Sequence, residues 1–392
     1  MTAPLLAHAM LVTTMLAAAM AMELPPLPTG RFAPTVIPEV PRPVWDWSRI
    51  PMSFHGAVKD RFYNNTEIAH LAKFQMVTTE KWYTPCASAG PTQSGPDCGA
   101  EYKIEGLFRQ LKARANLTTI MYWNTLLDFS FYAAHARMEE FEAAGQQSWL
   151  RDKFGEVAQL CNDGAVYCNM TTYDWTKPWV RQFWMETVLN FTQTGVVDGI
   201  FADHSGKWGN GLDIGADVKG QGPLQYCDAG PKCYNFTADF AASYNSWHDW
   251  ATNFTQDFLS KSTGGPVIQG ARATMHKLNP CDFDAVRTAH ENTSILVFEA
   301  KQCSPSRNCL AAYLAAVEPF IYLHCLYNGD DLVADTHFPE MDYALGAPDG
   351  PAIEIPSPGS NVWRRTFASG AWVEYDNNPR RKNGTLHFPR KL

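Results

Sequence analysis

A short stretch of the chain, Val197–Trp208, joins a buried strand to groups that can do chemistry; it reads VDGIFADHSGKW. Its apolar run stops at Asp203, and a polar, glycine-containing loop follows. An apolar strand has no structural need for an acid at its end, so we expect the carboxylate to face a cleft. Glu80 and Glu299 follow two other apolar runs in the same way. The pattern predicts a site where carboxylates converge.

Converging carboxylates are the groups that hydrolyse glycosidic bonds: one is ionised and attacks, and the other is protonated and donates to the leaving oxygen. Crowded like charges and partial burial raise the pKa of one carboxyl group, which separates the two roles. A separation of about 5 Å suits retention of the anomeric configuration, and a wider gap suits inversion. We expect Asp203 and Glu299 to form the catalytic pair. Two carboxylates and water suffice, so we expect neither a cofactor nor a metal ion.

Short apolar runs that alternate with helical patterns must position these acids. Seven runs are interpreted as strands: Met52–Gly56, Met76–Trp82, Leu117–Asn124, Val196–Asp203, Pro266–Gly270, Ser294–Lys301 and Phe320–Tyr327. Their near-continuous apolar character is typical of buried parallel strands, and the alternation indicates βα units. With an eighth strand near Met341–Leu345, the expected α/β fold is a (β/α)8 TIM barrel. The alternative is an open doubly wound sheet, which is less expected because no glycine-rich phosphate loop follows the first strand.

Helical spacing of apolar residues predicts helices over 67–74, near 104–111, from Pro178 onward and over 240–258. The 392 residues are 45% hydrophobic, which is enough for a large core. Four regions are expected: a signal peptide at 1–21, a proline-rich arm at 22–48, the catalytic barrel at 49–350 and a C-terminal β extension at 351–392. The extension contains a β-hairpin whose turn lies around Ser369 and Gly370.

The active site of a TIM barrel lies at the C-terminal ends of its strands. Polar residues at or just beyond these ends are expected to bind the substrate: Glu80, Lys81, Tyr122, Asn124, His204, Trp208, Gln269, Arg272, Lys301 and His324. Glu80, Asp203 and Glu299 follow the second, fourth and sixth runs. Because alternate strands contribute to one layer of side chains, we expect the three acids to point into one volume. His55, at the end of the first run, is a further candidate for a substrate hydroxyl.

Each acid also has a structural interpretation. Asp203 could cap its loop or pair with Lys207, and Glu299 could pair with Lys301 or Lys81. Glu80 is expected to support the site by pairing with a lysine rather than to react. Three aromatic residues could stack on sugar rings, although core or loop packing explains each as well: Tyr122, Trp123 and Trp208.

Two acidic positions outside the strand ends have other roles. Asp198 precedes the core of its strand and is expected to cap or to form a salt bridge. Asp330 and Asp331 follow the seventh run and form a reserve acid pair on a loop at the mouth.

Export from the cell is expected from three features. The apolar N-terminal stretch ends in Ala19-Met20-Ala21, which is typical of a signal-peptide cleavage site, although the basic segment that usually precedes it is missing. No later segment is long and apolar enough to span a membrane. N-x-S/T sequons begin at Asn64, Asn116, Asn169, Asn190, Asn235, Asn253, Asn292 and Asn383. An uncleaved N-terminal anchor is the alternative to cleavage.

The ten cysteines are the third feature, since an even number in close pairs is typical of disulfides in an oxidising compartment. Spacing predicts five pairs: Cys86 with Cys98, Cys161 with Cys168, Cys227 with Cys233, Cys303 with Cys309, and Cys281 with Cys325. Zinc binding by these thiols is not expected because no C-x-x-C pair occurs.

Three segments resemble putative TIM-barrel glycoside hydrolases that are largely uncharacterised as enzymes: LAKFQMVTTEKW, GVVDGIFAD and YALGAPDGPA with the following VWRRTFASGAWVEYD. The resemblance spans residues 50–375. A looser analogy links the fourth and sixth strands to the retaining α-galactosidase clan. That analogy implies Asp203 as nucleophile, Glu299 as acid/base and retention. The chain lacks the K-Y-D pattern that the clan carries on its fourth strand.

Other classes of function fit less well. The net charge of −8 and the absence of a basic run argue against a nucleic-acid partner, so the expected partner is an oligo- or polysaccharide. The first strand lacks the His-x-His of metal-dependent barrels, and D-H-S-G-K around Ser205 fails the G-x-S-x-G pattern of serine hydrolases. The remaining alternative is a secreted carbohydrate-binding barrel that has lost catalysis.

Overall fold

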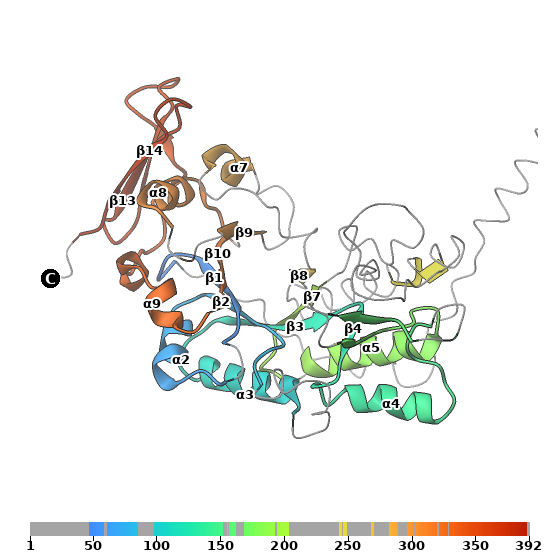
Figure 1. Ribbon diagram of the computed structural model, residues 1–392. Helices are drawn as coiled ribbons and strands as arrows, with labels where there is room; N and C mark the ends of the chain where they lie inside the picture. Colours follow the sequence, from blue (N-terminus) through green and yellow to red (C-terminus); the bar gives the residue numbers. More distant parts are fainter. Residues whose placement is uncertain are drawn as a thin grey trace, which may run out of the picture. The chain divides into compact units, whose positions relative to one another are not determined.

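The computed structural model describes most of the chain between residues 47 and 389 (Figure 1). The described residues are 47–58, 61–84, 98–151, 155, 157–161, 168–192, 194–203, 243–244, 246–248, 268–269, 282–288, 296–300, 303, 305–319, 321–327 and 329–389. All of them belong to one compact unit, Glu39–Leu392. At 159–161, 168–170, 189, 268–269 and 296–300 the description covers the backbone alone.

A parallel sheet of seven described strands is the core of this unit. Its strands are β1 (Met52–Gly56), β2 (Met76–Thr79), β3 (Thr118–Asn124), β7 (Gly199–Asp203), β8 (Ile268–Gln269), β9 (Leu296–Ala300) and β10 (Ile321–Tyr327). Their order in the sheet is β8-β7-β3-β2-β1-β10-β9, with every neighbouring pair parallel. Each strand coincides with one of the seven predicted runs. The α/β class and the parallel sheet are therefore confirmed.

The place of β10 corrects the predicted strand count. β10 pairs with β1, so it takes the position that the last strand of a barrel would take. The strand expected at Met341–Leu345 is wrong, because Pro339–Asp342 forms the 3-10 helix η2. β9 is the sixth of the seven described parallel strands along the chain, and it lies at the edge of the sheet beside β10. A strand between β8 and β9, which a closed barrel needs, is not among the described residues.

Close approach at the end of β1 tightens its contact with β10. A Cβ atom placed on Gly56 would lie 2.0 Å from the carbonyl oxygen of Tyr327, so no side chain fits there. The hydroxyl of Tyr313 on the helix behind them donates to the carbonyl oxygens of Pro51 and Ile321. The first and last strands are thereby joined through a buried polar contact as well as through the sheet.

Seven helices accompany the described strands, and α2, α3 and α5 coincide with predicted helices, whereas the other four were not predicted. The helices are α2 (Asn65–Leu71), α3 (Ala100–Lys112), α4 (His135–Ala143), α5 (Pro178–Thr192), α7 (Phe283–Thr288), α8 (Arg307–Ala316) and α9 (Leu332–Thr336). The predicted apolar face of α3 is buried, as are Val180, Trp184 and Val188 on α5. The helix predicted over 240–258 lies almost wholly outside the described residues.

Two antiparallel sheets accompany the parallel one. A small sheet of β4 (Leu127–Phe129), β6 (Cys168–Thr172) and β5 (Gln159–Cys161) is inserted between β3 and α5 and was not predicted. The C-terminal sheet contains β11 (Ile353–Glu354), β12 (Val362–Thr366), β13 (Trp372–Asp376) and β14 (Asn383–His387). The predicted hairpin is confirmed as β12–β13, and Gly370 takes a φ of +81° in its turn.

Two predicted disulfide pairings are wrong. Cys303 bonds to Cys325 on β10, and not to the nearby Cys309. Cys325 is consequently not the partner of Cys281. Cys98 and Cys309 are also disulfide-bonded. No described helix combines the length and the apolar character that crossing a membrane requires.

A buried anchor at the start of β7 confirms the structural role predicted for Asp198. Its carboxylate accepts hydrogen bonds from Lys112 Nζ at 2.7 and 2.8 Å and from the Thr119 backbone N–H at 2.8 Å. The Asp198 backbone N–H donates in turn to the Thr119 carbonyl oxygen at 2.9 Å. The acid thus ties α3 and β3 to β7, the strand that ends in Asp203.

Replacing Asp198 by Ala should lower the free energy of unfolding by about 2 kcal/mol, because the buried Thr119 N–H loses its acceptor. Urea unfolding followed by circular dichroism measures the change. The exposed Asp349→Ala is the control and should change stability by less than about 0.5 kcal/mol. Equal stability of the two variants would mean that Asp198 anchors nothing.

Candidate active site

Side-chain contacts between neighbouring strands are offset from the backbone register: each residue contacts a side chain two positions beyond its register partner. His55 is in register with Thr78 on β2, yet its ring bonds to Glu80. Tyr122 likewise bonds to Asp203, two residues beyond its register partner on β7. Tilted strands in a barrel-like sheet are staggered in this way. The stagger brings residues from the ends of β1, β2, β3 and β7 into one polar cluster.

Asp203 lies at the carboxyl end of β7 and accepts hydrogen bonds from two side chains of β3. The Tyr122 hydroxyl donates to Oδ2 at 2.5 Å, and Asn124 Nδ2 donates to the same oxygen at 3.3 Å. Asn124 Nδ2 also donates to the Tyr122 hydroxyl at 2.9 Å. Two donors aimed at one oxygen fix the orientation of the carboxylate. Tyr122 and Asn124, both predicted site residues, therefore belong to the site as partners of Asp203.

The backbone around Asn124 holds it rigidly in this position. Its Oδ1 accepts from the N–H groups of Leu126 and Leu127, both at 2.8 Å. Its carbonyl oxygen accepts from the indole N–H of the buried Trp184 at 3.0 Å. The next residue, Thr125, donates to the Asp203 carbonyl oxygen through its hydroxyl and through its backbone N–H, both at 2.9 Å. The end of β7 is consequently fixed from both sides of the carboxylate.

Glu80 is fully engaged by two partners. Its Oε1 accepts from His55 Nε2 at 2.6 Å and its Oε2 from Lys81 Nζ at 2.9 Å. Burial alone would raise the pKa of Glu80, but the charge of Lys81 and the hydrogen bond from His55 outweigh it and lower the pKa to about 2. A carboxylate with that pKa is no proton donor near neutral pH. The predicted supporting role of Glu80, paired with a lysine, matches this geometry.

Lys81 connects the Glu80 pair to the Asp203 group. Its Nζ lies 4.0 Å from the centroid of the Tyr122 ring and 4.8 Å from that of Trp82. Cations are attracted to the faces of aromatic rings. Burial, then the charges of Asp203 and Glu80, raise the pKa of Tyr122 well above its usual value. The Tyr122 hydroxyl therefore stays protonated and donates a hydrogen bond to Asp203.

Two predicted sugar platforms are instead part of the core. Tyr122 is 1% exposed, and its ring is stacked on Phe201 at a centroid distance of 5.9 Å. Trp123 is also 1% exposed and is stacked on Tyr132 at 4.7 Å. Neither ring has a face open to a sugar, because strand alternation places Trp123 on the helix side of the sheet and Tyr122 beneath Lys81.

A pair of buried histidines lies beside Glu80. His324 Nδ1 and the Ser53 hydroxyl are hydrogen-bonded at 2.9 Å, and the His324 ring centroid is 5.8 Å from that of His55. Burial, followed by His55, lowers the pKa of His324 well below its usual value, so the ring is neutral. Among the described residues, His55 Nδ1 and His324 Nε2 have no hydrogen-bond partner. Buried polar atoms of this kind are suited to bind a hydroxyl or water.

Ser53 was not predicted to belong to the site, whereas His55 was a candidate and its position beside Glu80 agrees with that expectation. The signal available in the sequence was weak. Both residues lie within the apolar run MSFHG, at alternate positions that a strand directs to one face. Ser53 lies in the middle of the strand, and nothing in the local sequence indicates that its side chain faces the polar cluster.

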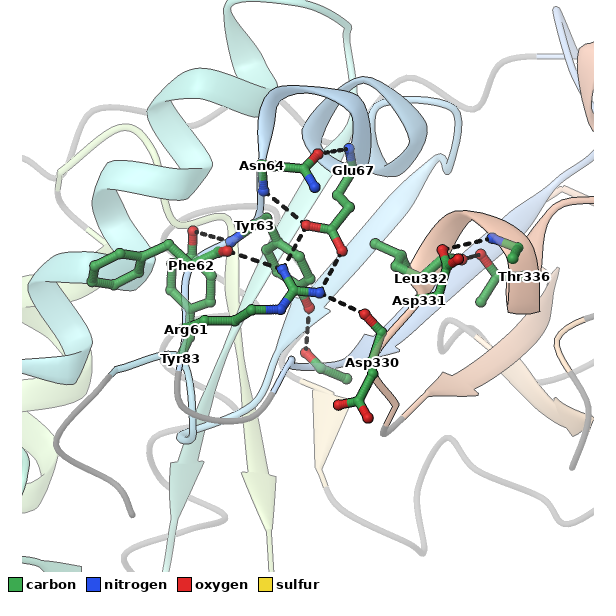
Figure 2. A network of polar contacts seen from close by, with 12 residues as sticks. Arg61, Phe62, Tyr63, Asn64, Glu67, Tyr83, Asp330, Asp331, Leu332 and Thr336 are labelled. Atoms are coloured by element: carbon green, nitrogen blue, oxygen red, sulfur yellow. Dashed lines mark hydrogen bonds and ion pairs between the residues drawn. The ribbon is translucent and has the colours of Figure 1, made fainter. Parts of the chain in front are cut away.

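The loops that follow β1 and β10 are fastened together by Arg61 (Figure 2). Its guanidinium donates to both carboxylate oxygens of Glu67 at 2.7 and 2.8 Å and to the Asp330 carbonyl oxygen at 2.7 Å. Asp331 caps α9 by accepting from the Ala334 N–H at 3.0 Å. The reserve acid pair Asp330–Asp331 is thus used in part to build this loop. Asn64 completes a reciprocal cap of α2 with Glu67.

Several predicted residues are not placed by side-chain contacts. His204, Trp208, Arg272 and Lys301 lie outside the described residues. Gln269 and Glu299 are placed by backbone alone: Gln269 is in register with Ala202, and Glu299 with His324. The described sheet order places β9 at the edge of the sheet, separated from β7 and β2 by other strands. The register still places it beside a strand that contributes to the polar cluster.

Comparison with known proteins gives only distant likenesses. The chain matches no protein-family model and no curated protein. Solved structures with some similarity include a dextranase from Flavobacterium johnsoniae (12% identity, 58% of this chain, 26% of that chain, TM-score 0.35). Others are an α-galactosidase from Lactobacillus brevis (9%, 84%, 46%, 0.40) and a maltogenic α-amylase from Thermotoga neapolitana (10%, 82%, 84%, 0.38). The chain spans about a quarter of the dextranase.

In the described part of the chain, no group of three or more His, Cys, Asp or Glu side chains is arranged to hold a metal ion.

The depressed pKa of Glu80 predicts an acid-dependent loss of stability. Its contribution is present above the unfolded-state pKa and is lost as pH falls through the folded value of about 2. Wild-type stability should fall between about pH 5 and pH 2 by on the order of 3 kcal/mol more than that of Glu80→Gln. Urea titrations across this range test the difference. Asp349→Asn, an exposed acid, should retain the wild-type slope; a parallel slope for Glu80→Gln would refute the ion-pair assignment.

Proposed function

We propose that the protein is a secreted glycoside hydrolase that acts on an oligo- or polysaccharide. The observation that carries this proposal is the half-buried Asp203 carboxylate, held at a strand end by the Tyr122 hydroxyl and by Asn124. The hydrogen bonds from Tyr122 and Asn124 fix the orientation of the carboxylate at the end of β7. An oriented carboxylate is what attack on an anomeric carbon requires.

Asp203 is proposed as the nucleophile because Glu80, the other carboxylate of the polar cluster, is bound to a histidine and a lysine. Glu80 is bound to His55 and Lys81, and its pKa of about 2 excludes the role of proton donor. In the proposed reaction, Asp203 forms a covalent glycosyl ester and water then hydrolyses it. The anomeric configuration is retained over the two displacements.

Glu299 is proposed as the acid/base that protonates the leaving oxygen. Support comes from its register beside His324, on the strand adjacent to β10. The loose clan analogy, which assigns the acid/base to the sixth strand, also supports Glu299, because β9 is the sixth described parallel strand along the chain. The two orphan ring nitrogens, His55 Nδ1 and His324 Nε2, are proposed to bind hydroxyl groups of the substrate.

Export is proposed as part of this function. The side chains of Asn64, Asn116, Asn190 and Asn383 are exposed, so four described sequons are accessible to a glycan. Cys98, Cys303, Cys309 and Cys325 are all in disulfides, as in proteins of an oxidising compartment. Both features support a secretory route.

Replacing Asp203 by Asn should lower kcat by at least about 100-fold on any glycoside that the wild type cleaves. A panel of aryl α- and β-glycosides and oligosaccharides, with NMR of the first anomer released, measures activity and stereochemistry. The control is Asp330→Asn, an exposed acid whose loop contact is made through its backbone, and it should retain activity.

The outcomes of this assay separate the two candidate functions. Loss of turnover in Asp203→Asn with an unchanged melting temperature supports hydrolysis. If the wild type binds glycans without cleaving them, and Asp203→Asn binds them equally well, the protein is a carbohydrate-binding barrel and the proposal of hydrolysis is wrong. A first product of inverted anomeric configuration would support hydrolysis but exclude the covalent intermediate on Asp203.

Tyr122→Phe should lower kcat by about tenfold and leave KM nearly unchanged. The change removes one hydrogen bond to a charged group, for which about 1.5 kcal/mol is typical, without removing the ring beneath Lys81. Steady-state kinetics with a thermal melt measures the effect. An unchanged kcat would show that the hydroxyl does not position Asp203.

A further inference from the structure

A hollow outside the candidate active site lies between helices α3, α4 and α5 and has a volume of about 770 Å³. Its described lining includes none of the residues of the candidate active site. Aromatic side chains from all three helices face it: Tyr102 from α3, Phe141 from α4, and Trp179 from α5. Tyr102 is 60% exposed, so a large ring on a folded helix is left without cover.

Asn190 lines the same hollow. It lies in the last turn of α5, its side chain is exposed, and it opens the sequon Asn190-Phe191-Thr192. The hollow therefore contains both an acceptor for an N-linked glycan and the aromatic surface against which a sugar can pack.

We propose that the N-linked glycan of Asn190 is seated in this hollow and packs against Tyr102. The donor is a lipid-diphosphate-linked oligosaccharide. A bond forms between Asn190 Nδ2 and the anomeric carbon, the bond from that carbon to the diphosphate oxygen breaks, and the diphosphate leaves with the electron pair. One amide proton is lost. The proposal rests on export and is independent of the catalytic assignment.

The chemistry of the lining matches that of a pyranose. The apolar C–H face of a sugar ring packs on aromatic rings, and its hydroxyl and N-acetyl groups need polar partners. Polar groups are supplied by Glu105 on α3 and by Gln182 and Glu186 on α5, which line the hollow beside the rings. Gln182 and Glu186 are hydrogen-bonded to each other at 2.9 Å. The volume lies within the range typical of pockets for small ligands.

Asn383 provides a contrast within the same molecule. It too is an exposed sequon residue that lines a hollow, of about 430 Å³, beside β12, β13 and β14. The described lining of that hollow is polar apart from Val362 and contains no aromatic ring. A glycan on Asn383 has acceptors and donors nearby but no stacking surface, so it is expected to remain mobile.

The test uses the full chain secreted from a eukaryotic host. The folded protein is treated with a peptide N-glycosidase, and site-resolved mass spectrometry follows release at each sequon with time. Release at Asn190 should be at least about tenfold slower than at Asn383, and the two rates should become equal after denaturation. Tyr102→Ala, an exposed position, should bring release at Asn190 close to the rate at Asn383.

A second measurement does not depend on the Tyr102 variant. Asn190→Gln should lower the melting temperature of the secreted protein by about 2 °C or more, whereas Asn383→Gln should leave it unchanged. An unoccupied Asn190, equal release rates at the two sites in the folded protein, or protection that survives Tyr102→Ala would each overturn the proposal. None of these readouts uses glycosidase activity, so its failure is distinguishable from failure of the proposed function.

Discussion

The parallel pairing of β1 with both β2 and β10 is the constraint on which the rest of the molecule depends. It aligns the carboxyl ends of strands from opposite ends of the chain at one edge of the sheet. The climb of two residues per strand then decides which side chains touch: His55 meets Glu80, and Tyr122 meets Asp203. A shift of any strand by one residue would turn these groups to the other face and disperse the cluster.

Within this cluster, charge is distributed so that two neighbouring carboxylates differ in character. Glu80 is compensated on both oxygens by His55 and Lys81. Asp203 receives neutral donors on one oxygen from Tyr122 and Asn124. The first arrangement compensates the charge of Glu80 and lowers its pKa to about 2. The second orients Asp203 by hydrogen bonds from uncharged groups. Lys81, over the Tyr122 ring, couples the two.

Outside the cluster, hydrogen bonds, ion pairs and a disulfide stabilise the described junctions between strands and loops. Asp198 anchors the start of β7, Arg61 joins two loops at the strand ends, and a disulfide ties Cys303 to β10. These contacts stiffen the surroundings of the site without entering it. Precise positioning of a reacting group needs such support, because a small displacement of the carboxylate misaligns its attack.

The sequence by itself determined the seven strands of the parallel sheet and three of its helices, because hydrophobic runs and helical spacing are local properties. Met52–Gly56 was predicted to the residue, and the hairpin around Gly370 and the anchoring role of Asp198 were also predicted correctly. The pairing of an acid with the adjacent Lys81 is likewise a short-range signal.

Only the tertiary structure decided which distant segments meet. It placed β10 next to β1, made Met341 part of a 3-10 helix, and joined Cys303 to Cys325 rather than to its neighbour in sequence. It also buried Tyr122 as a partner of Asp203. The physical reason is that strand order, tilt and disulfide geometry depend on contacts between residues far apart in the chain. No local pattern of residue types encodes those contacts.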